Sequence, residues 1–156
     1  MLAHGSTANA LHHRLCYEGG GLPGLLTALR DAGVALVLDV RAVPISRKKG
    51  FSKNQLAAHL SETGIAYRHL RGLGTPKAGR EAARSGDHGT FEEIFRAHME
   101  EPDALLDLSE AMTLAAETPA CLLCFERDPK DCHRLIVADR MTGEAGFQIV
   151  HLFAEA

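Results

Sequence analysis

A nearly continuous apolar run from Val34 to Val40, interrupted only by Asp39, constrains the fold of this chain more than any other feature. A strand that is apolar on both faces is typical of a parallel sheet covered by helices on both sides. A second run, Cys121 to Phe125, has the same character, and apolar residues recur at helical spacing over residues 22–29. The sequence therefore predicts strands that alternate with helices.

The remaining patterns extend this alternation along the chain. The helical patterns cover residues 22–32, 52–63, 90–101, 105–115 and 129–141. Strands are predicted over residues 14–17, 34–40, 65–70, 121–125 and 147–152. Such alternation implies parallel strands joined by right-handed crossovers. We therefore predict a three-layer α/β fold with Rossmann-like topology, in which a mostly parallel sheet of about five strands has helices on both faces.

Local signals predict where some of these helices begin. Ser52 with Gln55, and Thr90 with Glu93, have the spacing of capping boxes. Residues 71–89 contain five glycines and one proline, and we predict a long irregular connection there.

Length and composition indicate one compact domain. We expect residues 14–156 to form a single α/β domain and residues 1–13, which are polar and patternless, to be a disordered leader. No apolar stretch reaches membrane-spanning length, so no membrane partner is predicted. Four cysteines, three of them within twelve residues, do not resemble a secreted disulfide framework, and we expect a cytoplasmic protein with reduced thiols.

Charged or glycine-rich sequence follows each of the first four predicted strands. These segments are Glu18 with its glycines, Asp39 to Arg41, Arg71 to Pro76, and Glu126 to Arg134. Ligands of open parallel sheets bind beyond the carboxyl ends of the strands. We therefore expect the four segments to converge on one cleft.

Asp39 and Arg41 lie two residues apart, so their side chains leave the strand on the same side. In one interpretation the carboxylate acts as an acid, a base or a metal ligand while Arg41 holds an anion. In the other, the two residues form a structural ion pair that closes the end of the strand. The sequence leaves both interpretations open.

The segment from Arg41 to Lys53 carries five basic residues and no acidic one. With Ser46, Ser52 and a helix start behind them, these basic residues, Arg47 among them, are typical of a loop that receives an anion such as a phosphate monoester, a nucleotide or a nucleic-acid backbone. A solvated loop is the alternative. Gly74 lies in the segment 70–76, whose glycines could bring backbone N–H groups close to the same anion.

Cys132 and His133 begin a predicted helix, with Glu126 in the preceding loop and Arg134 next in sequence. A thiol at a helix N-terminus beside an imidazole would have a lowered pKa and be a nucleophile. Alternatively, Cys124, Cys132 and His133 could bind zinc, although their spacing is not that of a standard zinc site. Cys121 is interpreted as a small core side chain.

Four motifs together resemble the domain of unknown function 488 family. They are C-Y-E-G at residues 16–19, L-V-L-D-V-R-A-V-P-I-S-R-K-K-G-F-S at 36–52, Y-R-H-L-R-G-L-G-T-P at 67–76 and L-L-C-F-E-R-D-P-K-D-C-H-R at 122–134. The resemblance implies a compact cytoplasmic α/β domain and carries no established reaction. The family's characteristic positions fall here on Tyr17, Glu18, Gly19, Asp39, Arg41, Pro44, Ser46, Phe51, Leu73, Gly74, Cys124, Glu126, Cys132, His133 and Arg134.

Two function classes follow from these residues. The first is an enzyme, a hydrolase or transferase acting on a phosphorylated or nucleotide substrate, with Cys132, His133, Asp39 and Glu126 as catalytic groups. Its ligand contacts would come from Glu18, Arg41, Ser46, Arg47, Gly74 and Arg134. The second is a non-catalytic module that binds an anion or nucleic acid. No cofactor is predicted apart from zinc, should the cysteines and His133 form a metal site.

Overall fold

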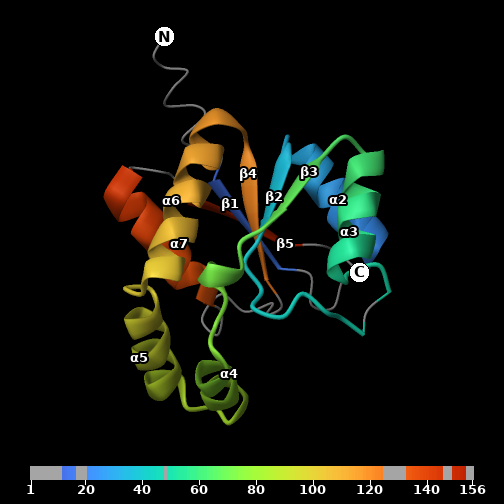
Figure 1. Cartoon of the computed structure of the whole chain (residues 1–156). Coiled ribbons are helices and arrows are strands. Elements are labelled where there is room, and N and C mark those ends of the chain that lie inside the picture. Colours follow the sequence, from blue (N-terminus) through green and yellow to red (C-terminus); the bar gives the residue numbers. More distant parts are fainter. Residues whose placement is uncertain (1–11, 17–20, 48, 125–132, 146–148, 154–156) are drawn as a thin grey trace.

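The computed structural model describes residues 12–16, 21–47, 49–124, 133–145 and 149–153 (Figure 1). Its strands are β1 (His12–Cys16), β2 (Leu36–Asp39), β3 (Ala66–His69), β4 (Ala120–Cys124) and β5 (Ile149–Phe153). Its helices are α2 (Leu22–Asp31), α3 (Lys53–Glu62), the 3-10 helix η1 (Arg71–Leu73), α4 (Lys77–Arg84), α5 (His88–His98), α6 (Pro102–Glu117) and α7 (His133–Ala145).

The strands form one sheet in the order β3-β2-β4-β1-β5, and every neighbouring pair is parallel. Asp39, the last residue of β2, is in register with His69 of β3 and with Leu123 of β4. The predicted α/β class with a parallel sheet is confirmed. Because β4 lies between β2 and β1, the order differs from the 3-2-1-4-5 order of the Rossmann fold by an exchange of two strands.

The direction of the connections decides which face each helix covers. The chain steps one way along the sheet from β1 to β2 to β3, and the opposite way from β3 to β4 to β5. Right-handed crossovers therefore place α2 and α3 on one face and α6 and α7 on the other. Figure 1 shows these helices on opposite sides of the sheet, as the predicted helical layers require.

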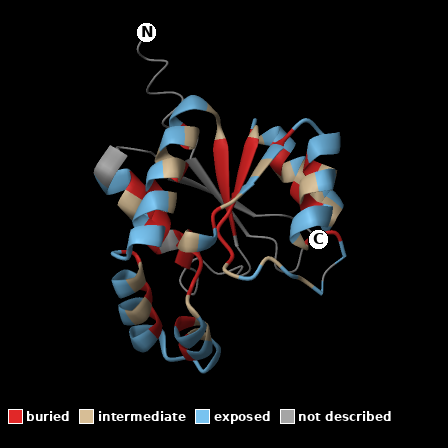
Figure 2. Ribbon diagram, in the orientation of Figure 1, coloured by how far each residue is buried: buried red, intermediate tan, exposed pale blue. Residues whose placement is uncertain are grey.

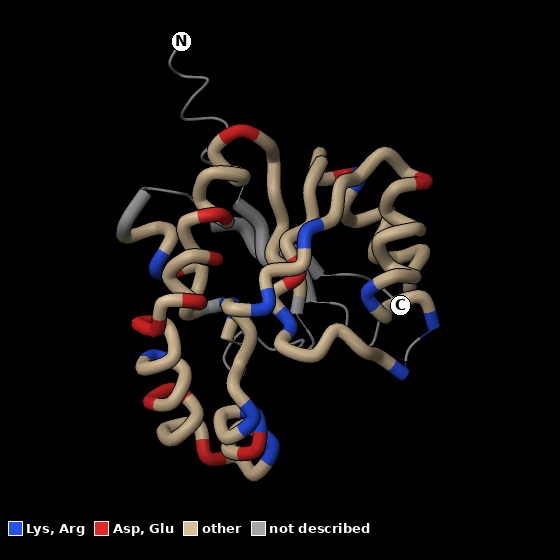
Figure 3. Tube along the Cα trace, in the orientation of Figure 1, with Lys and Arg blue, Asp and Glu red and all other residues tan. Residues whose placement is uncertain are grey.

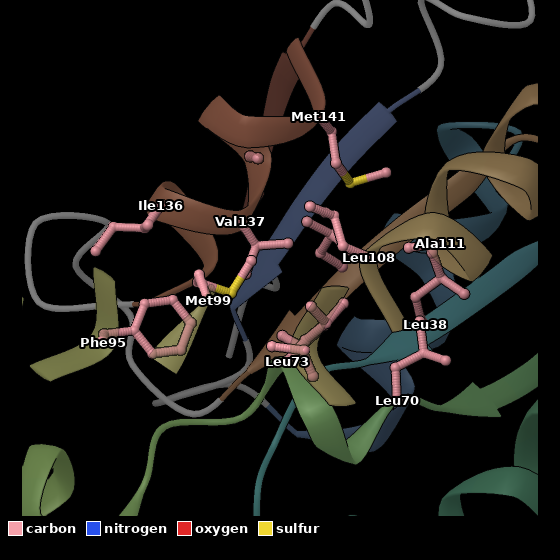
Figure 4. Close-up of a cluster of buried hydrophobic side chains, with 14 of the residues drawn as sticks. Leu38, Leu70, Leu73, Phe95, Met99, Leu108, Ala111, Ile136, Val137 and Met141 are labelled. Carbon is pink, nitrogen blue, oxygen red and sulfur yellow. The ribbon is translucent and has the colours of Figure 1, made fainter. Parts of the chain in front are cut away.

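Two apolar cores fill the space between these layers. Successive residues of β2 point to opposite faces, so Val37 joins one core while Leu36 and Leu38 join the other. This explains why the run that predicted β2 is apolar without alternation, and why the buried residues lie on both sides of the sheet (Figure 2). The core beneath α6 and α7 includes Leu73, Phe95, Met99, Leu108, Ala111, Val137 and Met141 (Figure 4).

Both predicted capping boxes are wrong. The side chain of Ser52, the N-cap of α3, makes no capping bond, because its hydroxyl accepts a hydrogen bond from the Ser46 N–H at 3.0 Å. Helix α5 begins at His88, and its N-cap is Asp87, whose carboxylate accepts from the Thr90 N–H at 3.1 Å. A carboxylate at an N-cap also meets the positive end of the helix dipole.

The predicted irregular connection over residues 71–89 is also wrong, since this segment contains η1 and α4. At the amino end, β1 begins at His12, so the last two residues of the predicted leader lie in a strand. The rest of that leader lies outside the described residues. No helix in the described part of the chain is long and apolar enough to cross a membrane.

Candidate functional site

The carboxyl ends of β2 and β4 meet at a point where the chain leaves the sheet in opposite directions. After β2 the chain continues to α3 on one face, whereas after β4 it continues to α7 on the other. Such topological switch points are where open α/β sheets bind their ligands. Segments that follow three strands come together here, because His69, His133 and Gly74 all contact residues 40–42.

Asp39 and Arg41 form a buried, bidentate ion pair. Arg41 Nε donates to Asp39 Oδ1 at 2.8 Å, and Nη2 donates to Oδ2 at 2.6 Å. Arg41 Nη1 donates to the carbonyl oxygen of Phe51 at 2.8 Å, which ties the end of β2 to the loop before α3. Asp39 is 0 % exposed and Arg41 is 2 % exposed, so the guanidinium makes its hydrogen bonds to groups inside the protein. This geometry favours the structural interpretation of the pair.

The Asp39 carboxylate accepts four hydrogen bonds. Besides Nε and Nη2 of Arg41, it accepts the Arg41 backbone N–H at 3.2 Å and the phenolic hydroxyl of Tyr67. Four acceptor positions are about the full capacity of a carboxylate. Asp39 would therefore have to break one of these bonds to act as a base or a metal ligand, and it serves best to position Arg41 and Tyr67.

Tyr67 is a member of this network that sequence reasoning missed. Burial raises the pKa of its phenol, and the negative charge of Asp39 raises it further, so the hydroxyl stays protonated and donates. Tyr67 precedes His69 by two residues on β3, so the two side chains share a face of the sheet. The alternation of side chains along β3 could have grouped Tyr67 with His69. Only the register between β2 and β3 shows that the side chain of Asp39 lies on the same face of the sheet.

His133, the first residue of α7, is held by the backbone that follows β2. It is 7 % exposed, its Nε2 lies 2.7 Å from the carbonyl oxygen of Val40, and Phe95 contacts its ring edge-to-face at 5.3 Å between centroids. Burial lowers the pKa of His133 to about 4. The imidazole is therefore neutral near pH 7, its Nε2–H donates to Val40, and Nδ1 carries the lone pair.

A buried positive charge lies close to His133. The Arg134 side chain is 2 % exposed, and its positive charge contributes to the lowered pKa of His133. Cys121 is fully buried, and burial raises the pKa of its thiol, which agrees with a small core side chain. On the other side of residues 40–41, His69 Nε2 lies 2.7 Å from the carbonyl oxygen of Arg41. Two consecutive carbonyl groups thus each hold an imidazole.

We expect the low pKa of His133 to make stability depend on pH. The unfolded chain takes up this proton near pH 6.5 and the folded chain only near pH 4, so acid favours unfolding within that window. The contribution, present above pH 6.5, amounts to about 3 kcal/mol and is lost progressively towards pH 4. Urea unfolding at a series of pH values measures it. The slope should flatten in His133→Gln and persist in His59→Gln; equal slopes in wild type and His133→Gln would contradict this expectation.

The other predicted ligand contacts lie at different places. Ser46 is half-buried and bonded to Ser52, and Arg47 is exposed in the loop before α3. Gly74 packs against Ala42: a Cβ built on it would lie 2.3 Å from the Ala42 nitrogen. Its missing side chain thus makes room for backbone, which is a structural reason for a glycine at this position.

Several predicted site residues lie outside the described residues. These are Glu18, Glu126 and Cys132. Cys124 is the last residue of β4, and its side chain is also outside the description. Among the side chains that the structure describes, no three histidine, cysteine, aspartate or glutamate residues come together as a metal site.

Comparisons with known proteins give one match. Neither a search of curated proteins nor a search of solved structures finds a match to this chain. A scan of protein families matches residues 22–141, which include β2, β3, β4 and the described residues of the site, to a domain of unknown function, DUF488. Since this match covers about three quarters of the sequence, the chain belongs to the DUF488 family.

Proposed function

We propose that this domain is an enzyme, a hydrolase or transferase, that binds a phosphorylated ligand beyond the carboxyl ends of β2 and β4 and uses His133 for proton transfer. The observation that carries the proposal is the placement of His133. Its imidazole is buried at the first residue of a 13-residue helix, is fixed through Nε2 by Val40, and lies beside the buried charge of Arg134.

The chemistry follows from the environment of the imidazole. A neutral histidine whose Nε2–H is engaged offers Nδ1 as a proton acceptor. Burial disfavours the protonated ring in the free protein, but an anion bound nearby would stabilise it. A phosphorylated ligand would thereby raise the pKa of His133 towards neutral pH, where proton transfer is most efficient. The N-terminus of α7 supports the same choice of ligand, because helix N-termini attract anions.

The network around Asp39 has a positioning role in this proposal. Its ion pair with Arg41 fixes the backbone at residues 40–41, and the carbonyl groups of these residues hold His133 and His69. Sequence adds Cys132 as nucleophile and Glu126 as a second proton-transfer group. Ligand contacts by Glu18, Ser46, Arg47, Gly74 and Arg134 stay predictions. Nucleotides and nucleic-acid ends are the phosphorylated ligands that we propose.

The proposal predicts that a phosphorylated ligand changes the titration of His133. We expect inorganic phosphate, AMP or a short 5′-phosphorylated oligonucleotide to raise the pKa of His133 by about one unit or more, which corresponds to about tenfold tighter binding to the protonated protein. NMR titration of the imidazole ¹⁵N resonances measures this, with the exposed His59 as internal control. If no phosphorylated compound moves the His133 resonances at any pH, the proposal is wrong.

A second measurement separates an enzyme from a binding module. The exposed positions of Arg47, Lys49 and Lys53 favour a module that holds an anion by charge alone. In the enzyme, ligand should protect Cys132 from alkylation, and the alkylation rate should report a thiol pKa below about 8.5. In the module, phosphate binding would fall with salt and survive both Cys132→Ser and His133→Gln.

A further inference from the structure

The exposed apolar side chains of this domain fall into two pairs. Among the described residues, the large hydrophobic side chains that are exposed are Val43, Ile45, Leu105 and Leu106. One pair lies in the loop between β2 and α3, and the other lies near the start of α6. Single exposed aliphatic residues are ordinary, whereas clusters of them mark interaction surfaces.

The first pair belongs to a positively charged loop, residues 42–53, here called the basic loop. From residue 42 to residue 61 the sequence contains no aspartate or glutamate. Among the described residues of the loop, the exposed basic side chains are Arg47, Lys49 and Lys53. Ile45, between Val43 and these residues, is 70 % exposed.

The basic loop is anchored although its apolar side chains are exposed. The backbone N–H of Lys53 donates to the carbonyl oxygen of Pro44 at 2.9 Å, and Ser46 and Ser52 bond to each other. Phe51 is fully buried in the core beside α3. Since the loop buries Phe51 and leaves Ile45 in solvent, Ile45 sits on a fixed support and would lose little freedom on binding.

The second pair belongs to a negatively charged segment, residues 100–110, here called the acidic helix face. No lysine, arginine or histidine occurs from residue 99 to residue 126. Leu106 is 69 % exposed, and its neighbours on the helix are Asp103 one turn before it and Glu110 one turn after it. Asp103 is exposed, while the glutamates of this segment pair with basic side chains of the same chain: Glu100 with Arg140, Glu101 with His98 and Glu110 with Arg68.

The two surfaces lie on either side of η1 and the residue that follows it. Gly74 contacts Ala42 at the start of the basic loop, and Gly72 lies against the carbonyl of Asp103 at the start of the acidic helix face. The Gly72 N–H also donates to Asp107 at 2.7 Å. In Figure 3 the backbone positions of basic residues on the loop before α3 lie apart from the positions of acidic residues along α6, with this connection between them. One molecule thus presents both surfaces without joining them.

We propose that the two surfaces bind each other between two copies of this chain, which form a two-fold symmetric dimer. The basic loop of each copy would lie on the acidic helix face of the other. In such an arrangement every contact occurs twice, so two small contacts add up to one interface. Aliphatic side chains meet aliphatic side chains at the centre, and lysine and arginine face aspartate and glutamate around them.

A second copy suits these surfaces better than a nucleic acid or a membrane. A nucleic acid would leave Leu105 and Leu106 in solvent and would be repelled by the acidic residues around them. A partner can cover both the basic loop and the acidic helix face only if it carries one acidic and one basic surface. A second copy of this chain carries both. Stable interfaces bury at least about 1,200 Å² of surface in total, and each of these contacts alone is smaller than that. We therefore expect a weak dimer. The dimer depends on Ile45 in the loop before α3 and Leu106 on α6, whereas the proposed function depends on His133 at the start of α7, so either can fail without the other.

Sedimentation velocity over about 1 µM to 1 mM protein tests the dimer. We expect a shift from monomer to dimer with rising concentration, weakened at least tenfold by Ile45→Glu and by Leu106→Lys, and weakened as salt screens the charges. Ala78→Glu, at an exposed position of α4 outside both surfaces, is the matched control and should leave the association unchanged. A wild-type chain that stays monomeric throughout overturns the proposal, and so does an equal effect of the control.

Mixing the two variants gives the decisive result. Ile45→Glu alters every basic loop, and Leu106→Lys alters every acidic helix face, so neither variant can form an intact contact with itself. A mixed dimer keeps one intact contact, and its other contact brings the two introduced opposite charges together. We therefore expect the mixture to associate at least tenfold more strongly than either variant alone. No gain on mixing would overturn the pairing of these two surfaces, since variants that merely misfold or act elsewhere would not complement each other.

Discussion

Asp39→Ala is expected to lower the free energy of unfolding by about 3–5 kcal/mol, because it leaves the guanidinium of Arg41 buried without its carboxylate. Arg41 is 2 % exposed, so water cannot replace the two side-chain hydrogen bonds that it donates to Asp39. The phenol of Tyr67 loses its acceptor in the same variant. Equilibrium unfolding in guanidinium chloride measures the effect.

Two further variants show whether the loss of stability in Asp39→Ala comes from removing the carboxylate beside the buried guanidinium of Arg41. Glu110→Ala breaks the ion pair with Arg68, whose side chain is 56 % exposed, and should cost less than about 1 kcal/mol. The double variant Asp39→Ala with Arg41→Met removes both charges and should be more stable than Asp39→Ala alone. An Asp39→Ala variant no less stable than Glu110→Ala would contradict this account of the pair.

The same substitution tests the positioning role of the pair. The carbonyl groups of Val40 and Arg41 hold His133 and His69, and the ion pair fixes the backbone that carries them. We expect the imidazole resonances of both histidines to move in Asp39→Ala. Resonances that stay in place while stability falls would show that the pair stabilises the fold without orienting the histidines.

The α/β class was predictable because its signals are local. A short apolar run without alternation, such as that of β2, is typical of a strand buried on both faces, and a period near 3.6 identifies α2 and α6. The strand order was not predictable. Local sequence does not contain the information that β4 lies between β2 and β1, because that depends on which strands meet after long crossovers.

The failures over residues 71–89 and at two helix starts also have physical causes. The glycines of the 71–89 segment concealed α4, whose sequence is otherwise rich in the helix formers alanine, arginine, lysine and glutamate. Ser52 has the right spacing for a capping box, but its hydroxyl bonds to Ser46 in the preceding loop. A hydrogen bond to Ser46 in the preceding loop therefore replaced the capping bond that the local sequence pattern predicts for the Ser52 side chain.

The candidate site was predictable only where its residues are close in sequence. Asp39 and Arg41 are two residues apart on one strand, and alternation alone placed them on the same side. Tyr67 meets Asp39 through strand register, and His133 meets Val40 across 93 residues. Such contacts are set by the assembled sheet, so the sequence pointed to His133 without showing which carbonyl group holds it.

Gly74→Ala is expected to destabilise the fold by about 3 kcal/mol, at the upper end of the cost of overpacking. A Cβ at this position would lie 2.3 Å from the nitrogen and 2.4 Å from the Cα of Ala42. Gly74 has φ of −83° and ψ of 155°, which any residue adopts, so the cost comes from the clash alone. Ala42 cannot retreat easily, because the neighbouring Arg41 is held on both sides, by Asp39 and by His69.

The same change at Gly143 should have the opposite sign. Gly143 lies inside α7, and a Cβ there meets nothing within 4 Å, so Gly143→Ala should stabilise the protein by about 0.5–1 kcal/mol through helix propensity. In Gly74→Ala, the added change Ala42→Gly removes only the Cβ of Ala42 and leaves its nitrogen and Cα, so it should restore little stability. Full rescue would locate the clash in the Ala42 side chain. A Gly74→Ala protein as stable as Gly143→Ala would contradict this account. It would show that the segments after β2 and β3 can separate freely, so that the contact of Gly74 with Ala42, beside His133, is not rigid.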